Sequence, residues 1–265
     1  MTTIYWFSGT GNSYAVARDI ANGLGDARMA PIASLSPEPM AAEGVVGVVF
    51  PVYFYGLPLV VREFLARVDL SRATYVFAVL TSGGFPGRGP AQAETLLRRA
   101  GRLPDAVFAV NAPGNYIALY DVPNVDSSRR LVEEAREAAT RISGDVKAQA
   151  KASVQQRRIA RLTSALFSVT FGRRFAATCH KQDRRFLATT ACTRCGLCAR
   201  ACPVANIELE DGRPRWLGHC EQCFACIHWC PVAAIQIRGA ATAKRGRYHH
   251  PNVSIDDIAS QRREV

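Results

Sequence analysis

The chain has 265 residues, of which 48% are hydrophobic, and its formal net charge is +11. This length allows one large domain and one small one, and the apolar content excludes a wholly disordered chain. The longest uncharged run, residues 45–61, falls short of a membrane span and contains two prolines, so no transmembrane helix is expected. No basic flank precedes the first apolar run, as a secretory signal would require, so we predict a cytoplasmic protein.

The positive charge is concentrated in one stretch. Between Lys151 and Thr190, nine lysines and arginines occur with a single acid, Asp183, and they give +8 of the total +11. This stretch fits either a solubilising basic surface or a docking surface for an acidic partner. No aromatic-interleaved recognition pattern accompanies the charge, so nucleic-acid binding is not expected.

Short apolar runs alternate with helical patterns in the first part of the chain. The expected strands cover residues 3–7, 28–32, 45–50, 74–80 and 106–110. The expected helices cover residues 13–24, 59–67, 91–100 and 127–142. The longer apolar runs lack polar alternation, which is typical of parallel strands that are covered on both faces. The pattern predicts an α/β doubly wound domain with a five-stranded parallel sheet.

The first strand leads into a loop, residues 8–13, that precedes a helix. Its glycines allow a tight turn, and a helix N-terminus offers free N–H groups to an anion. Tyr14 stands where a dinucleotide fingerprint needs its last glycine, and the Gly-Lys-Ser/Thr of a P-loop is absent. The hydroxyls of Ser8, Thr10 and Ser13 suit the terminal phosphate of a mononucleotide, with a plain turn as the alternative.

Two further loops follow predicted strands. Residues 51–58 contain three consecutive aromatic residues on which a flat ring could stack, and the backbone amides of residues 81–85 could contact the polar edge of a flavin. Ligands of open α/β sheets bind at the carboxyl ends of the strands, where all three loops are expected to lie. The three loops together favour a flavin over simple packing. Residues 111–116 could either cap this site or face the cysteine-rich part of the chain.

Eight of the nine cysteines fall in two similar runs, CTRCGLCARACP (192–203) and CEQCFACIHWCP (220–231). Every cysteine recurs at an offset of 28, which indicates an internal duplication. Tight clusters of this kind indicate metal binding in a reducing compartment rather than disulfides. The ninth cysteine, Cys179, is expected to be a buried thiol, with a reactive or ligating role as the alternative.

Thiolate runs of this type select iron–sulfur clusters or zinc. Zinc would use two pairs per ion, leaving the third cysteine and the proline of each run without a function. In two-cluster bacterial ferredoxins the fourth cysteine of a run ligates the other cluster. We therefore expect two [4Fe–4S] clusters, one held by Cys192, Cys195, Cys198 and Cys230 and the other by Cys220, Cys223, Cys226 and Cys202.

These motifs resemble known proteins. Residues 1–144 resemble flavodoxins through the 8–13 loop, and residues 188–238 resemble bacterial 2[4Fe–4S] ferredoxins. The combination resembles flavodoxin–ferredoxin fusion proteins of anaerobic prokaryotes, of which HCEQCFACIHWCP (219–231) and RYHHP (247–251) look characteristic. The resemblance implies a ferredoxin-like α+β second domain and FMN as the flavin. The phosphate side would be formed by Ser8, Thr10, Gly11, Asn12 and Ser13, and the ring side by Pro51, Tyr53, Phe54, Ser82 and Gly83.

The expected organisation has four parts. Residues 1–144 form the FMN domain, 145–187 a basic helical connector, 188–238 the cluster domain and 239–265 a tail. The connector has apolar positions at Leu162, Leu166, Phe167 and Phe171. The roles of the connector and of the RYHHP segment are not explained by either parent fold.

Our leading hypothesis is an intracellular electron carrier or reductase module that uses both clusters and FMN. No second glycine-rich fingerprint is present for a nicotinamide, so the electron donor is expected to be a reduced ferredoxin or a partner oxidoreductase. One alternative is an FMN-dependent reductase of a small molecule, with Tyr116, Tyr120 or His228 as proton donor. Another is a non-enzymatic redox sensor whose basic connector docks a partner.

Overall fold

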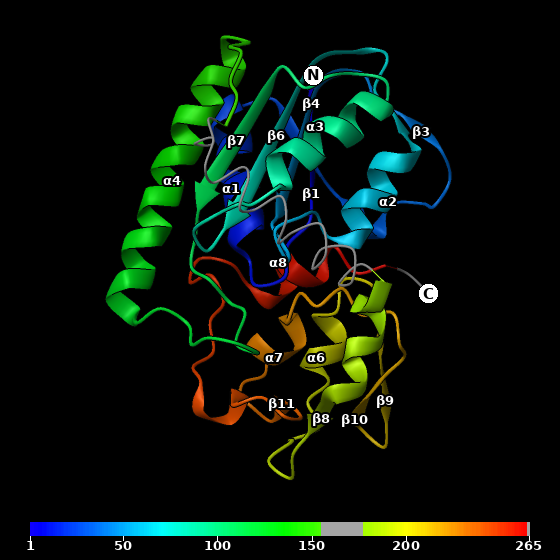
Figure 1. The fold of residues 1–265 in the computed structure, drawn as a ribbon, viewed down its shortest axis with the longest axis vertical. Helices are drawn as coiled ribbons and strands as arrows, with labels where there is room; N and C mark the ends of the chain where they lie inside the picture. Colours follow the sequence, from blue (N-terminus) through cyan, green and yellow to red (C-terminus); the bar gives the residue numbers. More distant parts are fainter. Residues whose placement is uncertain (155–176, 264–265) are drawn as a thin grey trace.

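The structure, a computed structural model, describes residues 1–154 and 177–263 (Figure 1). The predicted apolar positions of the connector, Leu162, Leu166, Phe167 and Phe171, lie outside the described residues. A sheet with helices on both faces forms the upper part of the molecule in Figure 1, and the cysteine-rich part lies below it. The carboxyl ends of the sheet strands point toward the cysteine-rich part.

Five parallel strands form the central sheet, in the order β2-β1-β4-β6-β7. Their bounds are β1 Thr2–Trp6, β2 Ala27–Pro31, β4 Gly44–Pro51, β6 Ala73–Ser82 and β7 Ala106–Asn111. Counting sheet strands alone, this is the order 2-1-3-4-5 of the flavodoxin-like doubly wound fold. The predicted fold class of the first domain is confirmed. A further pair, β3 Met40–Ala41 and β5 Val68–Asp69, was not expected, because two-residue strands leave no periodic pattern.

Four helices cover the sheet. They are α1 Asn12–Leu24, α2 Leu59–Arg67, α3 Gly89–Arg99 and α4 Val125–Lys147, and a 3₁₀ turn, η1, spans Ile32–Ser34. Helices α1 and α4 pack on one face with their own buried cluster, and α2 and α3 pack on the other (Figure 1). Helix α4 starts two residues earlier than predicted because the Asn124 side chain caps it, accepting from Ser127 N–H at 2.8 Å.

The cysteine-rich part is built from short elements. They are η2 Cys179–Arg185, β8 Phe186–Ala188, α6 Leu197–Arg200, β9 Ile207–Glu210, β10 Arg213–Trp216, α7 Ala225–His228, β11 Ile235–Ile237 and η3 Thr242–Lys244. Strands β8 and β11 pair antiparallel, as do β9 and β10. Each cysteine run therefore gives a loop and one short helix, α6 or α7, as the duplication predicts.

The duplication is also visible in the backbone. Left-handed φ angles recur 28 residues apart, at Ala205 (53°) and Ala233 (48°). The hydrogen bonds to the fourth cysteines repeat as well, since Asn206 N–H and Ala234 N–H each donate at 3.2 Å to the Sγ atom four residues earlier. The two runs thus share one conformation as well as one spacing.

The two parts of the molecule share a continuous apolar core. The buried cluster on the α2 and α3 face of the sheet runs directly into residues of the cysteine-rich part, including Phe224, Ile227 and Trp229. The chain then returns to the sheet domain through α8, Ile255–Ala259, which lies between the two parts in Figure 1. Among the described helices, none is long and apolar enough to span a bilayer.

The packing of Gly47 on the central strand β4 can be tested with a matched glycine. A Cβ at Gly47 would lie 2.3 Å from the Phe77 ring, whereas one at Gly144, in α4, would meet nothing within 4 Å. We expect Gly47→Ala to lower the free energy of unfolding by about 1–3 kcal/mol. Gly144→Ala should raise it by about 0.5–1 kcal/mol, because alanine favours a helix interior. Urea unfolding followed by far-UV circular dichroism measures both, and equal effects would contradict this packing.

Candidate cofactor-binding site

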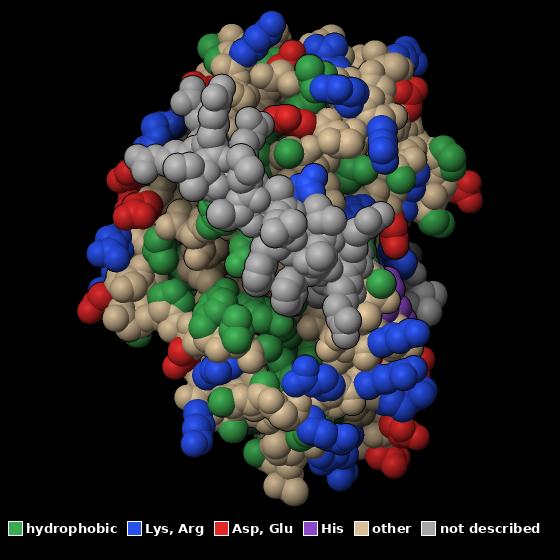
Figure 2. Space-filling model, in the orientation of Figure 1, with side chains coloured by type: hydrophobic (Ala, Val, Ile, Leu, Met, Phe, Trp, Pro, Cys, Tyr) green, Lys and Arg blue, Asp and Glu red, His purple; other side chains and the backbone are tan. Residues whose placement is uncertain are grey.

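A cavity of about 640 Å³ opens where the carboxyl ends of the sheet strands meet the cysteine-rich part. Of the ten residues predicted to bind a flavin, nine line it: Ser8, Thr10, Asn12, Ser13, Pro51, Tyr53, Phe54, Ser82 and Gly83. Gly11 is not among the lining residues, and its left-handed φ of 97° instead starts helix α1. Figure 2 shows hydrophobic side chains gathered on the viewed face between the two parts of the molecule. The structure thus brings the three predicted loops to one site.

The phosphate loop, residues 8–13, keeps donors available for an anion. Helix α1 begins without a side-chain cap. Within the described residues, the backbone N–H groups of Thr10, Asn12 and Ser13 have no acceptor. Since the first N–H groups of a helix need partners, this end of α1 fits a phosphate group.

The hydroxyls of the loop are already oriented by neighbours. Ser13 Oγ pairs with Thr81 Oγ1 at 2.7 Å, and Thr10 Oγ1 accepts from Asn115 Nδ2 at 2.9 Å. Sequence reasoning did not assign Thr81 or Asn115 to the site, although both belong to loops that it had singled out. These contacts connect the phosphate loop to the ends of β6 and β7.

A strained turn presents the aromatic wall of the cavity. Tyr53 and Gly56 exchange both backbone hydrogen bonds, each 2.9 Å long, around Phe54 (φ 49°) and Tyr55 (φ 62°). Two consecutive left-handed residues are typical of a type I′ turn, which favours Asn-Gly, so aromatic residues here are costly. Phe54 packs edge-on against Tyr116, with ring centroids 5.0 Å apart. The surrounding structure therefore holds two aromatic rings in an unusual conformation at the site.

Residues of the second cysteine run close the cavity from the other side. Gln222 and Phe224, which alternate with the cysteines of that run, are part of its lining. A Cβ at Gly9 would lie only 2.6 Å from the carbonyl oxygen of Cys223, so the two loops are in direct contact. The indole N–H of Trp229 also donates to Gly9 O at 3.2 Å. The phosphate loop and the second cysteine run thus form one unit.

Eight of the cysteines gather in two groups of four. Cys192, Cys195, Cys198 and Cys230 together line one small void of about 20 Å³. In the other group, burial raises the pKa of Cys223 to about 12, and the adjacent Cys202 thiol raises it further. Burial also raises the pKa of Cys220 and Cys226, with Cys202 again among the neighbours. The fourth cysteine of each run therefore lies with the first three of the other.

Both cysteine groups fit the binding of iron–sulfur clusters. Backbone N–H groups already donate to Sγ atoms, such as Gln222 N–H to Cys220 at 3.3 Å, in the way that tunes cluster sulfurs. The Tyr53 Oη atom is buried without a partner in the described structure. No three His, Cys, Asp or Glu side chains of the described chain are arranged to hold a single metal ion. A four-iron cluster bound by four cysteines does not require its ligands to converge on one ion.

Several residues of the site were missed or left undecided by sequence reasoning. The loop after β7 serves both parts, because the Asn115 side chain contacts Thr10 while its carbonyl oxygen pairs with His228 Nε2 at 2.8 Å. Tyr116 and Tyr120 line the cavity. Cys179 is buried, and its Sγ donates to Cys220 O at 3.3 Å, as a structural thiol would.

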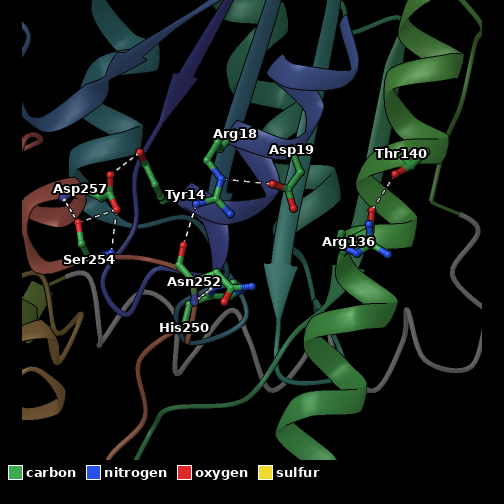
Figure 3. A network of polar contacts seen from close by, with 9 residues as sticks. All are labelled: Tyr14, Arg18, Asp19, Arg136, Thr140, His250, Asn252, Ser254 and Asp257. Atoms are coloured by element: carbon green, nitrogen blue, oxygen red, sulfur yellow. Dashed lines mark hydrogen bonds and ion pairs between the residues drawn. The ribbon is translucent and has the colours of Figure 1, made fainter.

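The RYHHP segment and the tail contact the phosphate loop and α1. Tyr248 Oη donates to Asn12 Oδ1 at 2.7 Å, and His250 N–H donates to Thr10 O at 2.8 Å. Figure 3 shows further contacts to α1, where Tyr14 donates to Asp257 and Arg18 donates to the carbonyl oxygen of Asn252. No local pattern marks these residues as part of a cofactor site.

Comparison with known protein families gives a match for one part of the chain. Residues 186–245 match the family of 4Fe–4S dicluster domains. The comparison with curated proteins gave no match. Similar solved structures include flavodoxins from Streptococcus pneumoniae TIGR4 and Megasphaera elsdenii. The first has 16% identity and a TM-score of 0.35, covering 53% of this chain and 98% of that one. The second has 18% identity and a TM-score of 0.35, covering 53% of this chain and 99% of that one.

An azoreductase from Bacillus anthracis is also similar, with 10% identity and a TM-score of 0.38, covering 55% of this chain and 100% of that one. The fold assignment of the first domain rests on the strand order of this chain and not on these likenesses.

The buried imidazole of His250 predicts acid sensitivity. Burial lowers its pKa to about 4 from the ordinary 6.5, with Arg18 and His249 adding to the shift. Below pH 6.5 the unfolded chain therefore binds a proton that the folded chain does not, and stability is lost as the pH falls toward 4. We expect the free energy of unfolding to drop by about 1–2 kcal/mol between pH 7 and pH 5 from this residue.

His250→Gln should remove that part of the pH dependence, whereas His249→Gln, which removes only a smaller electrostatic contribution to the shift, should keep most of it. Urea unfolding of the three proteins at both pH values measures the effect. An unchanged difference between pH 7 and pH 5 in His250→Gln would contradict it.

Proposed function

We propose that this chain, which joins a flavodoxin-like domain to a 4Fe–4S dicluster domain, transfers electrons between two [4Fe–4S] clusters and a bound FMN. The flavodoxin-like fold and the dicluster match support a redox electron-transfer function in general. The observation that carries the specific proposal is the shared wall of the cavity. Gln222 and Phe224 line the cavity and lie between cysteines that would ligate a cluster.

FMN fits the residues at the cavity. The free N–H groups at the start of α1 would bind its phosphate, and the Phe54 and Tyr116 rings would border the flavin ring system. Ser82 and Gly83 would lie along the same cavity. A flavin exchanges one or two electrons, and each cluster exchanges one.

The two cysteine groups differ in their exposure to solvent. This difference supports an order in which electrons pass through them. Cys195 is exposed, whereas Cys220, Cys223 and Cys226 are buried, and Cys223 lies against Gly9 of the sheet domain. The group that contains Cys195 would therefore face an external partner, and the group that contains Cys223 would face the flavin cavity. Holding both groups in one chain keeps the redox centres at a high effective concentration.

The external donor would be a protein. Near the group that contains Cys195, the cysteine-rich part exposes Arg194 and also Arg200, which pairs with Asp256. Such basic residues favour an acidic partner, such as a reduced ferredoxin or another oxidoreductase. Rapid oxidation of NADH by the purified protein alone would contradict a protein donor.

One observation favours a second function, reduction of a small molecule at the flavin. The cavity extends beyond the predicted flavin residues to Tyr116, Tyr120 and Arg185. Burial raises the pKa of the Tyr116 phenol, so its O–H is intact at neutral pH and can donate a hydrogen bond to a bound molecule. A small molecule that perturbs the flavin absorbance of the oxidised protein would favour this function.

Cofactor content tests the proposal most directly. Protein purified without oxygen should contain about eight iron atoms and one FMN per chain, because each four-iron cluster takes four cysteines. Iron, acid-labile sulfide and flavin should be quantified on the same sample. About four iron atoms in fully folded protein, or no flavin after incubation with FMN, would contradict it.

The proposed order predicts different outcomes for two cysteines. Cys195→Ala should lose one cluster and slow the reduction of FMN by a reduced bacterial ferredoxin at least tenfold, whereas reduction by dithionite should still occur. Cys179→Ser, a control outside the repeat that keeps a donor to Cys220 O, should keep about eight iron atoms and the wild-type rate. Stopped-flow absorbance of the flavin measures both. An unchanged rate in a Cys195→Ala protein that has lost one cluster would show that electrons enter elsewhere.

A further inference from the structure

We propose that the C-terminal segment, residues 246–263, is part of the flavin phosphate site, and that Gln261 is the residue that positions the phosphate loop. The inference rests on the proposed binding of FMN. The inference goes beyond FMN binding, because it assigns a role to a segment that belongs to neither the sheet nor the cysteine repeat.

Gln261 makes a reciprocal pair of hydrogen bonds with the first residue of the phosphate loop. Its Nε2 donates to Ser8 O at 2.6 Å, and its Oε1 accepts from Ser8 N–H at 3.1 Å. The Gln261 residue is fully buried, with 0% exposure, and Ser8 is 1% exposed. One carboxamide thus satisfies both backbone polar groups of Ser8, which water does not reach.

The position of Ser8 determines the loop that follows it. Ser8 Oγ accepts from Gly11 N–H at 3.1 Å, and Gly11 directly precedes helix α1. Because a buried N–H or C=O without a partner is costly, loss of Gln261 would force Ser8 to move or to find new partners. Either change would displace the free N–H groups at the start of α1 that would bind the phosphate.

The same segment contacts alternate residues of the loop. Besides the bonds from Gln261 to Ser8, His250 N–H donates to Thr10 O at 2.8 Å and Tyr248 Oη donates to Asn12 Oδ1 at 2.7 Å. Three residues of the phosphate loop are therefore held by the C-terminal segment. This arrangement fits preorganisation of an anion site, because four hydrogen bonds from the segment fall on three residues of the loop predicted to bind phosphate.

Gln261 is itself anchored on both sides. Before it, a capping box of Ser254 and Asp257 starts α8, and Tyr14 Oη donates to Asp257 Oδ1 at 2.8 Å (Figure 3). After it, Arg263 N–H donates to Pro203 O at 2.9 Å, next to the cluster ligand candidate Cys202. The segment thereby bridges both parts of the molecule while it fixes the loop.

The test compares FMN with riboflavin, which lacks the phosphate. Full-length protein that retains its clusters is freed of flavin, and the dissociation constant of each flavin is measured by fluorescence quenching without oxygen. Gln261→Met keeps the size of the side chain but loses both hydrogen bonds. We expect it to weaken FMN binding at least tenfold while riboflavin binding changes less than twofold.

Two further variants sharpen the result. Gln261→Glu keeps the acceptor for Ser8 N–H, loses the donor and adds a negative charge near the phosphate, so it should weaken FMN more than Gln261→Met does. Ser260→Ala, at the exposed neighbouring position, should leave both dissociation constants unchanged. If Gln261→Met does not fold, Tyr14→Phe removes one anchor of α8 and should weaken FMN selectively by a smaller factor.

The outcomes separate the inference from the proposed function. Equal weakening of FMN and riboflavin in Gln261→Met, or no weakening of either, would overturn the positioning role while FMN binding stands. A wild-type protein that binds neither flavin would overturn the proposed function and this inference with it.

Discussion

The contact between Gly9 and Cys223 is the constraint on which the rest of the site depends. An added Cβ at Gly9 would lie 2.6 Å from Cys223 O, so only glycine lets the phosphate loop approach the second cysteine run this closely. The Trp229 indole stabilises the same contact by donating a hydrogen bond to Gly9 O. Because the two loops touch, the cavity and the buried cysteine group share a wall. A looser junction would place solvent between them.

A buried carboxylate holds the same junction from the other side. Glu221, next to Cys220, accepts from Val60 N–H at 3.2 Å at the start of α2. Burial raises the pKa of Glu221 to about 7, and the hydrogen bond to the helix start opposes that rise. The positive end of a helix favours a carboxylate, which offsets part of the cost of burying it. A residue of the cysteine run therefore caps a helix of the sheet domain, and neither part completes its polar contacts alone.

The duplicated halves have diverged where one of them meets the cavity. Both halves use a left-handed residue before their short helix, and it is Gly196 (φ 74°) in one and Phe224 (φ 57°) in the other. Phenylalanine is strained in this conformation, whereas glycine is not. The Phe224 ring packs against Tyr116, with centroids 5.3 Å apart, and lines the cavity. At this position the strain is thus found only in the half that borders the cavity, where Phe54 and Tyr55 are left-handed as well.

The sequence by itself determined the features that local patterns encode, namely the strands, the cysteine loops and the order of the loops along the chain. Uninterrupted apolar runs predicted the parallel strands, and the offset of 28 residues predicted two cysteine loops of one conformation. The position of three loops after three strands predicted nine of the residues that line the cavity, because strand direction alone places those loops at one edge. Only the tertiary structure decided which distant segments complete the site. Gln261 meets Ser8 across 253 residues, and Asn115 meets both Thr10 and His228. Such contacts leave no periodic pattern, because they are selected by the packing of the whole chain and not by the conformation of the residues beside them.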